Sequence, residues 1–171
     1  WPFPSLTEGS ASSFQEEQER FSEKLQLAVD LRLKADVEVG AYLSGGIDSS
    51  AIVALASQSR QDGIRTYSIA FKEKSYDERG AQDIVSKLFK TDHHMIDCDY
   101  KDIESNFRNV IWHTEAPIFR TAPSPLFMLS QAVHEDGLKV VLTGEGSDEI
   151  LLGYDLFQEL RIRKFWARRP E

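Results

Sequence analysis

The stretch Tyr42–Ser50, YLSGGIDSS, decides the fold because it ends one apolar run and opens another with a different period. Before it, residues 37–43 (VEVGAYL) are short and partly β-branched, and they run into Gly45 and Gly46. This pattern predicts a buried strand that enters a tight loop. After it, residues 48–58 repeat apolar side chains at helical spacing, so a helix should follow the loop.

The same alternation of strand and helix continues along the chain. Further strands are expected at 65–71 (RTYSIAF), 93–98 (HHMIDC) and 139–143 (KVVLT). Further helices are expected at 77–89, 100–113 and 126–135. Strands separated by single helices predict an α/β fold, a doubly wound parallel sheet with right-handed crossovers and helices on both faces.

An amino-terminal helix is predicted to precede this alternation. Ser13 and Glu16 have the spacing of a capping box, so the helix should start there. Its apolar positions should lie against the sheet: Phe14, Phe21, Leu25, Ala28, Val29 and Leu33. Ser75 and Glu78 repeat the capping-box spacing and predict the start of the helix at 77–89.

Length and composition indicate one domain and exclude several classes. The chain has 171 residues, of which 41% are hydrophobic, enough for a single core. A formal charge of −8 argues against nucleic acid as a partner. A lone cysteine, Cys98, cannot form an internal disulfide, which fits a cytoplasmic protein. No window is apolar enough for a membrane span, and no export signal is visible.

The domain expectations follow from local composition. Residues 1–12, rich in proline, glycine and serine, are predicted to form a linker, and residues 13–160 one domain. Residues 161–171 form a basic tail expected to pack on further parts of the protein. The chain starts with Trp1 and has no obvious closing element, which suggests a piece of a longer protein.

The turn after the first strand can hold an anion. Gly45 and Gly46 tolerate positive φ, so their backbone N–H groups can converge at the positive end of the next helix. Further hydrogen bonds can come from Ser44, Ser49 and Ser50. Asp48 would repel a bare phosphate but suits a bound magnesium ion. The lysine of a Walker loop is absent, and a plain glycine turn with a capping serine or Asp48 is the alternative.

A second polar loop follows the strand at 139–143. Residues 144–149 (GEGSDE) place the carboxylates of Glu145, Asp148 and Glu149 close together. Because ligands bind beyond the carboxyl ends of parallel strands, Asp48 and Asp148 could hold one divalent cation from two adjacent loops. An acidic helix start is the alternative for this loop.

The two loops resemble those of the synthetase domain of glutamine-dependent asparagine synthetases, members of the ATP pyrophosphatase family. The order SGGIDSS, TYSIAF, SYDE, TDHH and GEGSDEILLGY matches the family over most of the chain. The resemblance implies an adenine nucleotide alpha hydrolase-like fold. It also implies cleavage of ATP between the α- and β-phosphates, which activates the aspartate side-chain carboxylate as an acyl-adenylate that ammonia converts to asparagine, with pyrophosphate and AMP released.

The resemblance also implies the site residues. The ATP and pyrophosphate contacts would be Tyr42, Leu43, Ser44, Gly45, Gly46, Asp48, Ser49, Ser50, Ile69, Thr143 and Gly144. Within this set, the backbone of Ile69 would meet adenine and Tyr42 would border the base. Asp48 and Asp148 would bind Mg²⁺, and with Glu145 they form the catalytic set. Weaker substrate candidates are Arg120 and Ser124.

The resemblance implies ATP and aspartate as partners, a glutaminase domain before this region, and a further helical region after it. It leaves room for a homodimer. The isolated chain should bind nucleotide weakly at best. The run Ile150–Gly153 (ILLG) replaces the usual phenylalanine-glycine-glycine sequence, which puts substrate specificity in question. The competing interpretations are a β-lactam-forming synthetase, a tRNA-modifying pyrophosphatase and a non-catalytic regulatory module.

Three residues that suggest metal or thiol chemistry are better explained structurally. His93 and His94 are adjacent on a strand, so their side chains should point to opposite faces and cannot easily share one ion. Cys98 ends the same strand and is expected to be a buried structural thiol.

Overall fold

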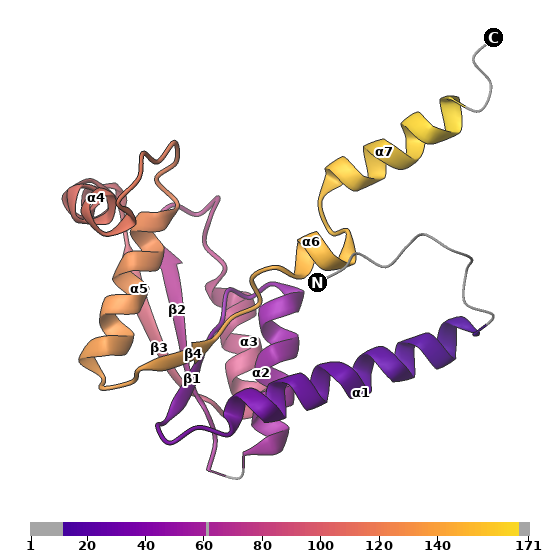
Figure 1. Ribbon diagram of the computed structural model, residues 1–171. Helices are drawn as coiled ribbons and strands as arrows, with labels where there is room; N and C mark the ends of the chain where they lie inside the picture. The colour runs from indigo at the N-terminus through magenta and orange to yellow at the C-terminus, as the bar shows by residue number, and fades with distance from the viewer. Residues whose placement is uncertain (1–11, 61, 168–171) are drawn as a thin grey trace.

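The computed structural model describes residues 12–60 and 62–167, and its centre is a parallel four-stranded sheet (Figure 1). The strands are β1 (Val39–Tyr42), β2 (Arg65–Phe71), β3 (Asp92–Cys98) and β4 (Val140–Leu142). Their order in the sheet is β3-β2-β1-β4, and each neighbouring pair is parallel. All four predicted strands are therefore present, and the predicted sheet type is confirmed.

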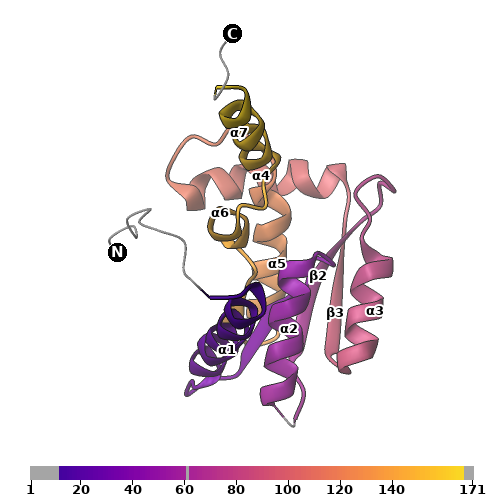
Figure 2. The same cartoon turned by 90° about the vertical axis from the view of Figure 1, so that its right-hand side faces the viewer.

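Helices cover both faces of the sheet (Figures 1 and 2). Their bounds are α1 (Phe14–Leu33), α2 (Ile47–Ser59), α3 (Arg79–Phe89), α4 (Tyr100–Thr114), α5 (Pro123–Glu135), α6 (Ser147–Leu151) and α7 (Asp155–Trp166). On one face α2 packs on β1 and α3 on β2, while α1 lies against α2. On the other face α5 packs on β2 and β3, and α4 lies against α5. The doubly wound arrangement follows from this placement.

Each face of the sheet has its own apolar core, because side chains alternate along each strand. Ala41 and Leu43 of β1 and the loop after it pack with Val53 and Ala56 of α2. On the opposite face, Tyr67 of β2 packs with a group of side chains from α5 and the segment after it: Leu129, Val133 and Leu138. The two cores hold the carboxyl ends of β1 and β2 between rigid helices.

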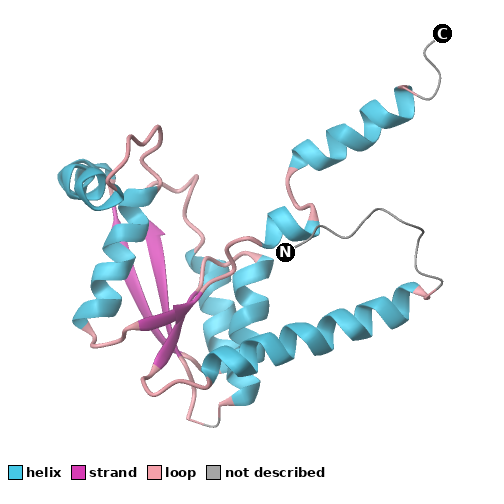
Figure 3. Ribbon diagram, viewed as in Figure 1, coloured by secondary structure: helices cyan, strands magenta, loops and turns pink. Residues whose placement is uncertain are grey.

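The first helix begins as predicted but packs over only part of its length. Ser13 caps α1 through a complete capping box with Glu16. Val29 is buried in the core beside α2. In contrast, Phe14 is 85% exposed and Phe21 is 47% exposed, so the prediction that the whole apolar face lies against the sheet is wrong. Figure 3 shows why: the amino-terminal half of α1 extends beyond the sheet and beyond α2.

The carboxyl-terminal part of the described chain differs from the sequence-based expectation. The sequence offered α6 only as the alternative of an acidic helix start and did not predict α7, and the expected domain boundary at residue 160 falls inside α7. In Figure 1, α7 extends away from the sheet. Most of the expected linker (residues 1–11) and the end of the basic tail (residues 168–171) lie outside the described residues.

The histidine pair and the cysteine lie as expected. The ring of His93 is 2.9 Å from the Thr66 hydroxyl, and burial lowers its pKa. The His94 ring faces the other side of the sheet, where its centroid lies 5.0 Å from that of the Tyr67 ring, with the two rings tilted by 31°. Cys98 is fully buried, and burial raises the pKa of its thiol. Among the described helices, none combines the length and apolar character needed to cross a bilayer.

Candidate functional site

The two polar loops meet at the carboxyl edge of the sheet because β1 and β4 are neighbouring strands. Gly40 of β1 pairs with Val141 of β4, so both loops leave the sheet at the same level. Between them lies a cavity of about 230 Å³. Its lining comes from both loops and the segment that follows α6: Tyr42, Ser44, Asp48, Ser49, Thr143, Gly144, Glu145, Gly146, Ser147, Asp148, Glu149 and Tyr154.

Hydrogen bonds between its own residues hold the first loop in a tight turn. Gly45 has φ +87°, a conformation that favours glycine. The hydroxyls of Ser44 and Ser49 are 2.9 Å apart, and the Ser50 hydroxyl donates to the Gly46 carbonyl at 2.7 Å. Gly46 is the N-cap of α2 and gives the helix no side-chain cap. The amide groups of the first turn therefore suit an anion bound at the amino-terminal end of α2.

The second loop lies directly against the start of α2. A Cβ atom on Gly144 would lie 2.9 Å from the Ser49 amide nitrogen and 3.2 Å from the Asp48 Cβ. Glycine is therefore required for this approach, since such contacts are shorter than packed side chains allow. The Ser147 hydroxyl donates to the Gly144 carbonyl and fixes the turn into α6. The two loops consequently behave as one unit.

The segment after α6 turns back and lines one side of the cavity. The Tyr154 hydroxyl donates to Glu149 at 2.7 Å. This hydrogen bond lowers the pKa of the Glu149 carboxyl and raises the pKa of the Tyr154 phenol. Gly153 lies against Asp148, because a Cβ atom on Gly153 would be 2.0 Å from Asp148 Oδ1. The absence of a side chain at Gly153 thus gives the Asp148 carboxylate its room.

Asp48 and Asp148, the predicted Mg²⁺ ligands, line the same cavity from two different loops. The described residues contain no cluster of three or more His, Cys, Asp or Glu arranged to hold a metal alone. Mg²⁺ is commonly bound by one or two carboxylates together with substrate phosphates and water, so two protein ligands suffice. Metal binding at this pair stays a prediction.

Not every predicted contact lines this cavity. Leu43 is buried, and its carbonyl accepts a hydrogen bond from Ser68. The carbonyl of Ile69 accepts a hydrogen bond from Gln82 at 3.1 Å. Gly45, Gly46 and Ser50 shape the turn but do not line this cavity.

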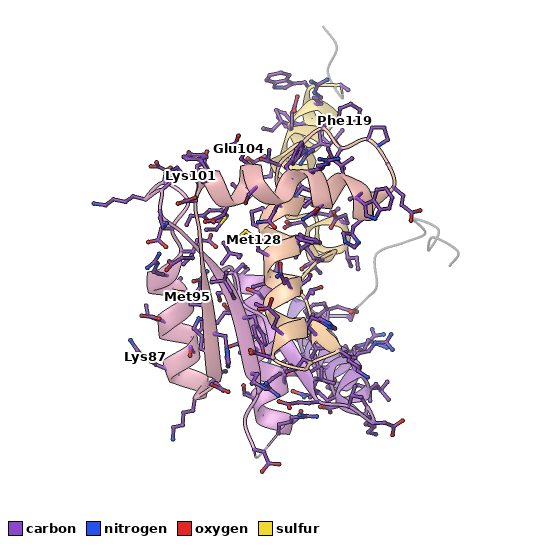
Figure 4. All side chains as sticks on the ribbon, turned by 90° about the vertical axis from the view of Figure 1, so that its left-hand side faces the viewer. Lys87, Met95, Lys101, Glu104, Phe119 and Met128 are labelled. Carbon is purple, nitrogen blue, oxygen red and sulfur yellow. The ribbon has the colours of Figure 1, made fainter. Side chains whose placement is uncertain are left out.

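The two weaker substrate candidates are placed differently from each other. Arg120 and Glu145 line a second, shallow cavity of about 570 Å³ next to the first. Its other lining residues are apolar: Pro117, Ile118, Phe119, Ala122, Pro123 and Leu126. Ser124 is fully buried at the start of α5, and its hydroxyl has no hydrogen-bond partner among the described residues. Figure 4 shows Phe119 on the loop between α4 and α5, where its side chain is 98% exposed.

Sequence reasoning missed several residues of the site. Ser147 and Tyr154 line the cavity, and Gly153 makes room for Asp148. The signal was available for Tyr154, since it closes the GEGSDEILLGY motif. Gln82 gave no signal, because a glutamine in an amphipathic helix is usually solvated.

The comparisons with known proteins agree with this geometry. A sequence model of the family described as asparagine synthase matches residues 20–171. The chain belongs to the asparagine synthase family. Its curated relatives include Amidase chyE of Penicillium rubens, which is 34% identical over 170 residues that cover 91% of this chain and 25% of the relative. They also include a putative glutamine-hydrolyzing asparagine synthetase 2 of Methanocaldococcus jannaschii, 36% identical over 74% of this chain and 24% of the relative.

These family relatives are much longer proteins, and the chain spans about a quarter of their length. A solved structure, the NH3-dependent NAD synthetase of Campylobacter jejuni, shares the fold with a TM-score of 0.54 and 19% sequence identity. It covers 80% of this chain, which in turn covers 60% of that structure. This likeness supports the adenine nucleotide alpha hydrolase-like fold that the resemblance implied.

Leu152 occupies a backbone position that favours glycine. It is the C-cap of α6 with φ 61° and ψ 41°, and its side chain is 58% exposed. We expect Leu152→Gly to raise the free energy of unfolding by about 0.5–1 kcal/mol, because the left-handed conformation is strained for a side chain. Urea denaturation measures this change. The control Leu151→Gly, one residue earlier in α6, should lower stability, and equal effects of the two substitutions would contradict the explanation.

Proposed function

We propose that the chain is the ATP-binding synthetase domain of a glutamine-hydrolysing asparagine synthase. The observation that carries the proposal is a cavity between the two loops that both Asp48 and Asp148 line, beside the uncapped start of α2. The family relation supports the same interpretation. In the longer protein, a glutaminase domain would supply ammonia.

In the proposed reaction, the aspartate side-chain carboxylate attacks the α-phosphorus of ATP. The bond between the α-phosphorus and the bridging oxygen breaks, and pyrophosphate leaves with that oxygen. Ammonia then attacks the acyl carbon, loses a proton and displaces AMP, which leaves asparagine. Mg²⁺, when bound, neutralises the phosphate charge that develops during cleavage.

The residues of the chain would bind and orient the reactants. The amides at the start of α2 and the Ser44 and Ser49 hydroxyls would bind the pyrophosphate part of ATP. The carboxylates of Asp48 and Asp148 would hold the magnesium that accompanies it. Glu145 lines both the cavity between the two loops and the neighbouring shallow cavity. Its carboxylate would therefore orient the incoming amine or take its proton.

The Glu145→Gln substitution tests this assignment in the full-length protein. We expect nearly unchanged affinity for Mg-ATP and an amide formation rate lower by about 100-fold, because the amide cannot accept a proton. Product analysis with Mg-ATP, aspartate and ¹⁵N-labelled glutamine measures both AMP and labelled asparagine. Unchanged asparagine formation would contradict the role of Glu145, and release of ADP with phosphate would overturn the proposed reaction itself.

A second candidate is amidation of a carboxylic acid other than aspartate. The relative named Amidase chyE matches 91% of this chain, and the cavity that contains Arg120 and Glu145 is otherwise apolar. A carboxylate near Arg120 with an apolar body would suit that lining. Measuring AMP release with aspartate and with a panel of apolar and aromatic acids separates the candidates. A rate with any apolar acid well above that with aspartate would favour the second.

A further inference from the structure

Gln82 is a polar side chain buried at the junction of the two strands that carry the proposed nucleotide contacts. It lies in the first turns of α3 and is only 1% exposed. Its Nε2 donates to the Ile69 carbonyl at 3.1 Å, at the end of β2. The same nitrogen lies 3.5 Å from the Ser44 carbonyl, in the loop after β1. One amide thus joins the two segments.

The orientation of this amide leaves its oxygen without a partner. Nε2 must face both carbonyls, so Oε1 points elsewhere, and in the described residues it is buried without a hydrogen-bond partner. A buried acceptor without a donor costs free energy that an apolar side chain would avoid. Proteins keep such locally unfavourable arrangements mainly at positions where function requires them. The amide is therefore better explained by what it holds in place than by its contribution to stability.

Backbone packing links the same helix to the same loop. A Cβ atom on Gly45 would lie 3.1 Å from the Ala81 Cβ and 3.4 Å from the Glu78 Cβ, so the loop rests on the start of α3. Gln82 follows Ala81 directly and adds a directional hydrogen bond to this contact. Together, the packing of Gly45 on α3 and the Gln82 hydrogen bond fix the position of the Ser44 loop relative to the end of β2.

We propose that Gln82 is a positioning residue, which sets the distance between the pyrophosphate-binding loop at Ser44 and the base-binding backbone at Ile69. The inference rests on the proposed function, because it requires ATP to touch both segments. ATP spans them, whereas free pyrophosphate touches the Ser44 loop alone. A loss of relative position should therefore weaken ATP binding more than pyrophosphate binding.

The Gln82→Met substitution in the full-length protein tests the inference, since methionine keeps the length of the side chain but removes the N–H donors. We expect the Kd for Mg-ATP, measured by calorimetry, to rise about tenfold, and the Kd for Mg-pyrophosphate to change less than about threefold. The matched control is Ser86→Ala, which removes another buried polar group of α3, one that accepts a hydrogen bond from Thr91 at 3.1 Å. This control should leave both Kd values within about twofold.

The results of these titrations distinguish failure of the positioning role from failure of the proposed function. Unchanged ATP affinity in Gln82→Met, or equal loss for both ligands, would overturn the positioning role. Absence of Mg-ATP binding in the unmodified protein would instead overturn the proposed function, and this inference with it. If Gln82→Met does not fold, Gln82→Glu replaces it, because its protonated acid can still donate one hydrogen bond. The Kd of that variant for Mg-ATP, divided by the Kd of the unmodified protein at the same pH, should fall as the pH falls. A ratio that does not change with pH would contradict the inference.

Discussion

Asp48→Asn is expected to lower kcat/KM for Mg-ATP by on the order of a thousandfold in the full-length protein, because it removes half of the carboxylate pair in the cavity. Asparagine keeps the shape of the side chain, so the fold should be retained. Asp148→Asn should produce a similar loss, and the double variant should lose far less than the product of the two single losses, because both carboxylates would serve one ion. Steady-state pyrophosphate release at varied Mg²⁺ concentrations measures these losses.

The control for this prediction removes the same charge elsewhere. Asp36 is exposed in the segment before β1, at the opposite edge of the sheet from the cavity. Asp36→Asn should therefore leave kcat/KM within about twofold, as surface changes usually do. Full activity in Asp48→Asn, or fully multiplicative losses in the double variant, would count against a shared magnesium ion.

Gly144→Ala is expected to lower Mg-ATP affinity by more than about 100-fold, because the new methyl group forces the two loops apart. Its Cβ would lie 2.9 Å from the Ser49 amide nitrogen, which belongs to the backbone and cannot turn aside. Overpacking of this kind also lowers stability by about 1–3 kcal/mol. A displacement of roughly 1 Å at the phosphate site accounts for the expected loss of binding. Calorimetric titration and urea denaturation measure the two effects separately.

Gly80 provides the matched glycine control. It lies in α3, and a Cβ atom there would meet nothing within 4 Å. Gly80→Ala should keep ATP affinity and raise stability slightly, because alanine favours helices. Normal ATP affinity in Gly144→Ala would show that the loops do not need their close approach, and the shared-cavity explanation would fail.

Much of the fold was predictable because short stretches of the sequence indicate their own secondary structure. Residues 65–71 are rich in β-branched and aromatic side chains between turn residues, and β2 has those bounds. Ser13 and Glu16 predicted the start of α1 through a mechanism that the structure reproduces. The adjacency of the two loops was also predictable, since ligand sites of parallel sheets gather at the carboxyl edge.

The failures have physical reasons. Ser75 and Glu78 have capping-box spacing, but α3 begins at Arg79 and its N-cap makes no side-chain hydrogen bond, because residues 72–77 form turns of their own. The apolar spacing of Phe14 and Phe21 predicted burial, yet periodicity does not tell how far a helix extends beyond its support. The α6 helix has five residues, too few for any periodic signal.

The sequence predicted the two loops of the candidate site but not the residues that hold these loops in place. Glycine pairs, serines and carboxylates after a strand indicate phosphate and metal chemistry by their type. Two contacts behind the cavity could not be recognised in the sequence: Gly153 against Asp148, which is close along the chain, and Gln82 against the Ser44 carbonyl, which is 38 residues away. A single sequence contains no record of which distant side chain meets a given carbonyl, so these residues needed the structure.

The pairing of β1 with β4 also has a kinetic consequence. Partners such as Gly40 and Val141 lie about a hundred residues apart, and loop closure over such a distance slows the formation of strand pairs. On a ribosome, β1 must wait for β4 to emerge, while β2 and α2 already surround it. The cavity between the two loops therefore cannot form before β4, a three-residue edge strand, has been synthesised.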